Sequence, residues 1–182
     1  MNAAIEINKH TIQDANLPLL VDEFSEEFAG CQIALIIDFF SRYDQIELDA
    51  KSRDLTGFQT PIGLLRITTL PQGATNLVTQ FVRIVTKILE DLIPKDCLPF
   101  LDDIGVKGLL STYDDKEVIP GIRQYVLEHI QSLDRTLVQL ERARCTIKPK
   151  SQFCIDRISI VDFVYKAKGQ NPDSAKVIKI LE

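Results

Sequence analysis

The ten residues Cys97-Leu-Pro-Phe-Leu-Asp102-Asp103-Ile-Gly-Val106 decide how the rest of the chain is interpreted. Two adjacent carboxylates lie between short apolar runs, and such runs meeting at a tight bend are typical of a β-hairpin. Burial of the runs would leave Asp102 and Asp103 at the bend. Side chains alternate along a regular strand, but at a bend two neighbouring carboxylates can approach one ion. Hard oxygen ligands of this kind suit Mg²⁺ or Mn²⁺.

A pair of aspartates is a short motif that also arises by chance. Asp114-Asp115 is a second such pair, but it lies among polar residues and indicates a solvated loop. The apolar frame distinguishes the first pair. A structural turn and a metal site both remain open at this point.

A third carboxylate follows a buried strand. Residues 33–37 form a continuous apolar run of strand length, which favours a central strand, and the run ends at Asp38. Phe39 and Phe40 come next, and the polar residues Ser41 and Arg42 follow them. Asp38 is therefore a candidate for a site at a sheet edge, with a solvated strand-end residue as the alternative.

The bulk composition describes a single soluble domain. The chain has 182 residues, of which 45% are hydrophobic and 26% charged. No window is apolar enough for a transmembrane helix, and residues 1–10 lack the apolar core of a signal peptide. We therefore expect an intracellular protein with no membrane partner.

The residues needed for several classes of enzyme are scarce. The four cysteines lack metal-ligand spacing, which favours reduced core residues. The only histidines, His10 and His129, argue against a Ser-His-Asp or Cys-His enzyme. His129 falls in a helical pattern and is predicted to lie on the helix surface.

The net charge of −5 is unevenly distributed. Residues 142–168 carry seven lysines and arginines against two aspartates, whereas residues 1–141 are strongly acidic. A basic segment on an acidic body can provide a phosphate-facing side, or it can be a solvated face.

The order of the remaining elements predicts an α+β fold with two helices covering an antiparallel sheet. In that layout Asp38 and the hairpin carboxylates converge at one edge, which is the arrangement that two-metal nucleotidyl transfer needs. The expected segments are an irregular region over 1–28, short strands over 43–48, 56–60 and 64–69, a buried helix over 77–93 capped by Thr75 or Asn76 and ended by Pro94, a polar loop over 109–117, a helix over 122–140, strands over 146–147, 153–155 and 158–164, and a helix over 175–181.

Several segments resemble the reverse transcriptase of gypsy-class LTR retrotransposons, in the same order and spacing. The similarity extends from about residue 7 to residue 182, and the occurrence of several motifs in the same order makes it specific. The segments are DFFSRYDQI over 38–46, LPQGATN over 70–76, FLDDI over 100–104, KPKSQF over 148–153 and PDSAKV over 172–177.

The resemblance implies an RNA- and DNA-directed DNA polymerase that adds deoxynucleotides to a primer 3′-hydroxyl. Its partners would be a primer–template of RNA or DNA and deoxynucleoside triphosphates, and its cofactors two Mg²⁺ or Mn²⁺ ions. By the same resemblance, Asp38, Asp102 and Asp103 would be the metal ligands. Tyr43 would lie under the incoming sugar. Gln72 and Gly73 would contact the nucleotide and template.

The same resemblance implies a lysine that protonates the leaving pyrophosphate. Lys150 is the candidate for this general acid and Lys148 its rival. Two residues depart from the family pattern, because Arg42 and Asp162 stand where glycine is usual.

The resemblance also suggests a division of the chain and a history for it. Residues 1–31 would be a remnant of the fingers, residues 32–170 a reverse-transcriptase-like palm, and residues 171–182 the start of the connection to a truncated thumb. We hypothesise a degenerate retroelement copy that holds primer–template poorly. The alternatives are a non-catalytic interaction module that keeps the palm fold and another two-metal enzyme such as a nuclease or cyclase.

Overall fold

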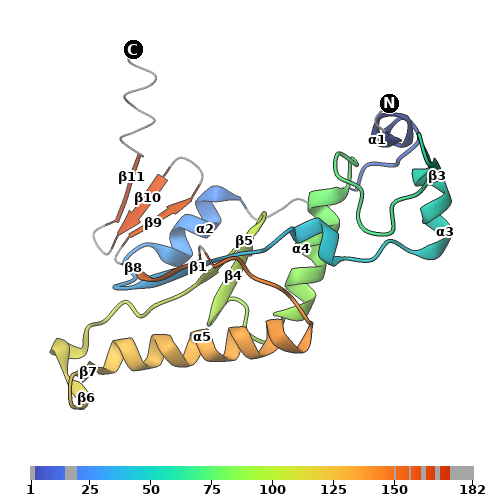
Figure 1. Cartoon of the computed structure of the whole chain (residues 1–182). Coiled ribbons are helices and arrows are strands. Elements are labelled where there is room, and N and C mark those ends of the chain that lie inside the picture. The colour runs from blue at the N-terminus through green and yellow to red at the C-terminus, as the bar shows by residue number, and fades with distance from the viewer. Residues whose placement is uncertain are drawn as a thin grey trace.

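The computed structural model of the chain describes residues 3–14, 20–149, 151–155, 157–160, 163–166 and 169–172. Its centre is a four-stranded sheet in the order β4-β5-β1-β8 (Figure 1). These strands are β1 (Ala34–Asp38), β4 (Cys97–Phe100), β5 (Asp103–Val106) and β8 (Gln152–Ile155). All three pairings between neighbours are antiparallel. The predicted hairpin and central strand are therefore confirmed.

Period-two alternation along β1 separates two apolar layers. Leu35 and Ile37 lie in one cluster with residues of α4 (Leu77–Ile88) and α5 (Gln124–Arg142). Ala34 and Ile36 lie in the other, against Phe24 and Phe28 of α2 (Val21–Phe28). Helices α5 and α2 therefore lie on opposite sides of the sheet (Figure 1). The prediction of two helices over the sheet is confirmed, and a third helix covers its second face.

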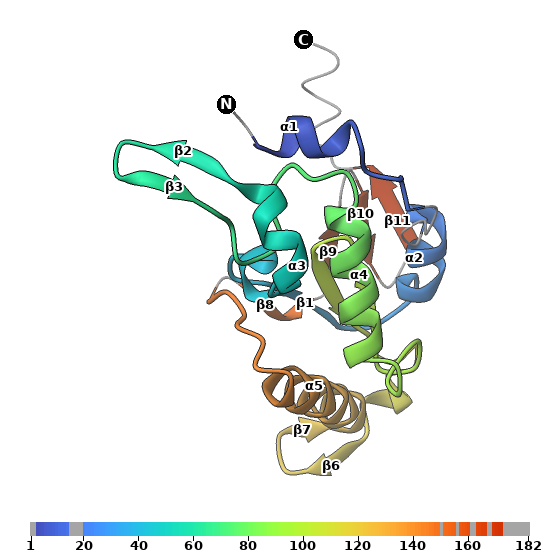
Figure 2. The same ribbon diagram turned by 90° about the vertical axis from the view of Figure 1, so that its right-hand side faces the viewer.

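The smaller elements surround this centre. The helical ones are α1 (Ala3–Asn8), η1 (Arg42–Gln45), α3 (Ala50–Arg53), η2 (Asp54–Thr56) and η3 (Tyr113–Asp115). The strands are β2 (Phe58–Thr60), β3 (Gly63–Leu65), β6 (Glu117–Ile119), β7 (Ile122–Arg123), β9 (Arg157–Ile160), β10 (Phe163–Lys166) and β11 (Gly169–Pro172). The β2–β3 hairpin projects from the body beside α1 and α3 (Figure 2).

Several predicted segments differ from the structure. Residues 1–28 are not irregular, because their described part contains α1 and α2; Phe24 and Phe28, four residues apart, give α2 an apolar face that its acidic residues obscure in the sequence. Residues 43–48 contain a 3₁₀ helix instead of a strand. Helix α4 ends at Ile88, before Pro94, and turns fill the interval. The strand expected over 64–69 is shorter, since β3 ends at Leu65.

Other expectations hold or lie outside the described residues. Asn76 is the N-cap of α4, but its side chain makes no capping bond. Cys31 and Cys97 are buried free thiols, and burial raises the pKa of Cys97 to about 11. Asp162 and the helix expected over 175–181 lie outside the described residues. Within the described ranges, no helix is long and apolar enough to span a bilayer.

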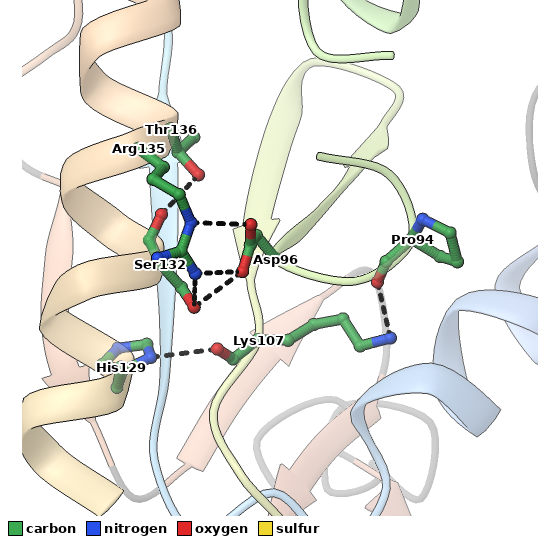
Figure 3. A network of polar contacts seen from close by, with 7 residues as sticks. All are labelled: Pro94, Asp96, Lys107, His129, Ser132, Arg135 and Thr136. Carbon is green, nitrogen blue, oxygen red and sulfur yellow. Dashed lines mark hydrogen bonds and ion pairs between the residues drawn. The ribbon is translucent and has the colours of Figure 1, made fainter. Parts of the chain in front are cut away.

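A buried polar cluster attaches α5 to the hairpin (Figure 3). The carboxylate of Asp96, a residue only 4% exposed, accepts hydrogen bonds from Ser132 Oγ at 2.9 Å and from Arg135 Nε and Nη2 at 2.9 and 2.6 Å. The backbone carbonyl of Asp96 accepts from the amide of Lys107 at 2.9 Å. Residues just outside both strands of the hairpin are thus held against one helix.

His129 belongs to the same region and corrects a prediction. It is 1% exposed and therefore lies inside the protein, not on the helix surface. Its Nδ1 lies 3.1 Å from the carbonyl oxygen of Lys107, and because a carbonyl only accepts, Nδ1 carries the proton. Nε2 has no hydrogen-bond partner in the described part of the chain. Burial lowers the pKa of His129, so the imidazole is neutral at physiological pH.

Gly105 permits α2 to pack closely on the sheet, and its replacement by alanine is expected to destabilise the protein by about 1–3 kcal/mol. A Cβ at this position would lie 2.4 Å from Cζ of Phe28 and 2.9 Å from Cζ of Phe24, and both rings are fully buried. Urea unfolding of Gly105→Ala measures the loss.

The matched control for this substitution is Gly57→Ala, because a Cβ there would meet only atoms at 3.7 Å. We expect Gly57→Ala to change the free energy of unfolding by less than about 1 kcal/mol. Equal losses in the two variants would show that α2 does not press on Gly105.

Candidate active site

Three acidic residues meet at one end of the central sheet. Asp38 ends β1 and Asp103 begins β5, and the two are direct partners in the antiparallel register. Asp102 lies in the two-residue turn between β4 and β5, where Leu101 has the left-handed backbone φ of 52°. The predicted convergence of residues separated by 64 positions is thus confirmed for the backbone, because β1 pairs with the whole of β5 and the register places Asp38 opposite Asp103.

The facing carboxylates of Asp38 and Asp103 influence each other. Burial raises the pKa of Asp103 above its ordinary value, and the negative charge of Asp38 raises it further. Like charges directly opposite on neighbouring strands are destabilising. The two carboxylates therefore repel each other when both are ionised, and a bound cation would reduce this repulsion.

Lys148 supplies one cation to this site. Its Nζ lies 2.9 and 2.8 Å from the two carboxylate oxygens of Asp38, and its amide donates to the Asp38 carbonyl at 2.8 Å. The hydroxyl of Ser151, three residues further along the chain, donates to the Lys148 carbonyl at 2.9 Å and accepts from the Asp38 amide at 3.4 Å. Lys150, the predicted general acid, lies outside the described residues.

Arg42 supplies a second cation. Its guanidinium pairs with the carboxylate of Asp102 and lies over the ring of Tyr43, 4.7 Å from the ring centroid. The turn that carries Tyr43 forms without glycine at position 42, because Ser41 takes the left-handed conformation with φ of 43°. The Tyr43 ring is half-buried and packs edge-on against Phe81 of α4, with centroids 5.6 Å apart.

Gln45 is a positioning residue that the sequence did not single out. Its side-chain amide donates to the carbonyl of Thr146 at 2.9 Å, and its carbonyl accepts from the Thr146 amide at 2.6 Å. These bonds hold the segment before Lys148 against η1. The partners are 101 residues apart, and the two segments are joined at the strand end by the pairing of Phe39 with Ile147 and by the hydrogen bond from the Phe40 amide to the Thr146 carbonyl at 3.0 Å.

Gln72 and Gly73 form a turn just before α4. Gln72 is exposed, and Gly73 has a φ of 90° that only glycine adopts without strain. Asn8 of α1 fixes this turn: its amide donates to the Gly73 carbonyl at 2.8 Å, and its side-chain oxygen accepts from the Thr75 amide at 2.8 Å. No hydrogen bond or ion pair described for the chain joins Gln72 or Gly73 to the three aspartates.

The side chains of the three aspartates are not gathered around one point. Among the residues that the structure describes, no group of three histidine, cysteine or acidic side chains is arranged to hold a metal ion. Two of the three carboxylates contact Lys148 and Arg42 instead. The backbone arrangement that was predicted is present, and two of its three carboxylates are paired with cationic side chains of the same chain.

An antiparallel sheet with helices on both faces and paired aspartates at its edge defines a polymerase-type palm. The sequence matches the family described as "Reverse transcriptase (RNA-dependent DNA polymerase)" over residues 3–177. The chain therefore belongs to the reverse transcriptase family.

Curated relatives come from retrotransposons. The chain is 27% identical over 177 residues to the "Retrovirus-related Pol polyprotein from transposon 297" of Drosophila melanogaster, covering 97% of this chain and 15% of that protein. It is 32% identical over 127 residues to the corresponding polyprotein of transposon 412 from the same organism, covering 68% of this chain and 10% of that protein. The chain thus spans less than a sixth of the length of these relatives.

Solved structures agree on the fold. A foamy viral protease-reverse transcriptase in complex with double-stranded DNA superimposes with a TM-score of 0.81 at 18% identity, covering 99% of this chain and 29% of that one. A foamy viral protease-reverse transcriptase in complex with an RNA/DNA hybrid gives a TM-score of 0.76 at 20% identity, covering 97% and 22%. The predicted palm is confirmed.

Proposed function

We propose that the chain is a polymerase domain that adds deoxynucleotides to the 3′-hydroxyl of a primer on an RNA or DNA template. The observation that carries this proposal is the direct pairing of Asp38 with Asp103, with Asp102 in the adjoining turn. Carboxylates at this spacing suit two-metal catalysis, and membership of the reverse transcriptase family supplies the reaction class.

The three aspartates would hold Mg²⁺ or Mn²⁺. Carboxylate oxygens are the hard ligands that these ions prefer. The pKa of Asp103 is raised by burial and then by the negative charge of Asp38, and a divalent cation would oppose both effects. The chemistry of these oxygen donors therefore fits the ions that the family implies. When bound, such ions lower the pKa of the attacking hydroxyl and neutralise the leaving pyrophosphate.

Lys148 is the lysine whose placement supports a role at this site. Its Nζ lies within 2.9 Å of both oxygens of Asp38, so it balances that carboxylate before cations bind and carries a proton that could be donated within the site. Lys150 keeps the role of general acid only as a prediction.

Tyr43, Gln72 and Gly73 would form the nucleotide contacts. The ring of Tyr43 is held by Phe81 at 5.6 Å and is rigid enough to support a sugar. Gln72 is exposed at a turn that Asn8 fixes from α1, and Gly73 allows close backbone approach. These contacts and the division into fingers and palm belong to the proposal.

The packing of α2 suggests one change to the proposed division. Phe24 and Phe28 form an apolar cluster with residues of β1 and β4, so α2 belongs with the palm. We place the start of the palm near Val21, instead of residue 32, and leave α1 with the fingers. Residues 171–182 remain the proposed start of the thumb connection.

One observation favours a second candidate function, a non-catalytic interaction module that keeps the palm fold. Two of the three carboxylates are already paired with cationic side chains, and an ion-paired site needs no metal to be stable. Such a module would keep its partner affinity when Asp38 is replaced by asparagine.

Primer extension on an RNA template with Mg²⁺ or Mn²⁺ tests the proposal, with Asp102→Asn beside the parent chain. We expect extension by the parent and a loss of at least about 100-fold in the variant, because a proposed ligand of the cations is removed. Circular dichroism establishes that both proteins are folded. Absence of extension by a folded parent chain would reject the polymerase proposal and leave the interaction module.

A further inference from the structure

Arg42 occupies a position that matters for any cation at this site. Its guanidinium pairs with Asp102, and its exposed side-chain fraction is 35%, so the pair is half withdrawn from solvent. In the described part of the chain, Asp102 has no other charged partner. Among the described residues, Asp102 belongs to no group of three histidine, cysteine or acidic side chains that could hold a metal ion.

The position of Arg42 is fixed by packing. Its guanidinium carbon lies 4.7 Å from the centroid of the Tyr43 ring, a distance at which the ring face attracts a cation. Tyr43 in turn packs edge-on against Phe81, which is 3% exposed in the core. A buried residue therefore holds the aromatic platform, and the platform holds the guanidinium beside Asp102.

Simultaneous binding of Arg42 and a divalent cation to Asp102 is electrostatically unfavourable. A carboxylate has two oxygens and could touch both, but the two positive charges would then lie within a few ångströms of each other. The other two aspartates do not face this competition equally, since Asp103 makes no ion pair in the described structure and Asp38 pairs with the flexible amine of Lys148. A planar guanidinium on an aromatic face is less easily displaced than an amine.

We propose that Arg42 is a resident counter-ion that competes with the divalent cation for Asp102 and so sets the cation concentration that the site requires. This inference rests on the proposed function for the identity of the metal ligands. Arg42 acts here as a positioning residue: in the cation-free state its guanidinium holds the Asp102 carboxylate in an ion pair, and cation binding requires that this ion pair opens.

The affinity for Mn²⁺, followed by electron paramagnetic resonance of the free ion, tests this proposal on the whole chain. Arg42→Gln removes the charge and is expected to lower the Mn²⁺ dissociation constant about tenfold, the effect of one nearby, half-screened positive charge. Arg42→Lys keeps the charge and is expected to stay within about threefold of the parent.

Arg66→Gln is the matched control, because it removes an arginine from another ion pair, with Asp54, and changes the net charge equally. The double variant Arg42→Gln with Asp102→Asn is expected to bind Mn²⁺ no tighter than Asp102→Asn alone, because Arg42 acts through that carboxylate. Thermal unfolding confirms that each variant is folded.

The outcomes separate this inference from the polymerase proposal. If folded Arg42→Gln binds Mn²⁺ no tighter than Arg66→Gln, or does not bind it at all, the competition is refuted, whatever the primer extension shows. If Arg42→Gln binds Mn²⁺ about tenfold tighter but no variant extends a primer, the competition stands and the polymerase proposal fails.

Discussion

Replacement of Asp103 by asparagine is expected to abolish primer extension and, at the same time, to stabilise the cation-free protein. The activity should fall by at least about 100-fold, because the side chain is one of the proposed ligands of the catalytic cations. The free energy of unfolding should rise by up to about 1 kcal/mol, the usual scale for like charges directly opposite on neighbouring strands. The two effects have opposite signs.

The sign of the stability effect follows from the pKa of Asp103. Burial and the charge of Asp38 raise this pKa in the folded state above its ordinary value of 3.8, so the folded protein binds the proton more tightly than the unfolded chain. Ionisation of Asp103 therefore costs stability as the pH rises through the raised pKa. The advantage of Asp103→Asn should be full at neutral pH and disappear below about pH 4.

Urea unfolding at pH 7 and pH 3.5, in the presence of a chelator, measures this effect. Asp114→Asn is the control, since Asp114 lies exposed in η3 and its replacement changes the net charge equally. A loss of stability in Asp103→Asn at pH 7 would mean that the Asp103 carboxylate has a favourable partner in the cation-free protein, and the account of a crowded site would be wrong.

The parts of the fold that could be predicted from the sequence are those that local pattern determines. The runs of β1 and of the β4–β5 hairpin are continuous and apolar, so their burial and their bend follow from composition alone. The helix α5 likewise follows from apolar residues that recur at three- and four-residue steps. By contrast, η1 replaces an expected strand because Ser41 adopts a left-handed φ, a choice that tertiary contacts impose.

The candidate site could be predicted only as far as its backbone. The alignment of Asp38 with Asp103 follows from two recognisable strands, whereas the partners of each carboxylate do not. Lys148 lies 110 residues from Asp38, and Gln45 lies 101 residues from Thr146. No periodicity encodes such contacts. The burial of His129 could not be predicted for a related reason. Its hydrogen-bond partner is the backbone carbonyl of Lys107, and every residue type has such a carbonyl, so no sequence pattern indicates the contact.

Replacement of Arg135 by alanine is expected to destabilise the protein by about 3 kcal/mol in the free energy of unfolding. Arg135 donates two hydrogen bonds to Asp96, whose side chain is only 6% exposed (Figure 3). Without Arg135, a buried charge keeps only the hydroxyl of Ser132 at 2.9 Å. Removing one partner of a buried pair leaves the other uncompensated.

The comparison with Asp96→Ala gives this prediction its test. That variant leaves Arg135 free to extend into solvent, because the arginine side chain is 45% exposed, so its loss of stability should be smaller than that of Arg135→Ala. In the double variant no buried charge remains, and we expect a stability close to that of Asp96→Ala alone. Additive losses would show that the two side chains do not act as a pair.

The pH dependence of unfolding supplies an independent check on the same ion pair. Arg135 holds the pKa of Asp96 below its ordinary value of 3.8, so the stabilisation is fully present above that value and is lost as the pH falls through the lowered pKa. The parent should therefore lose its advantage over Asp96→Ala between about pH 4 and pH 2. A constant difference across that range would mean that the carboxylate contributes by packing and not by charge, because only a charge-dependent contribution to stability is lost when Asp96 is protonated.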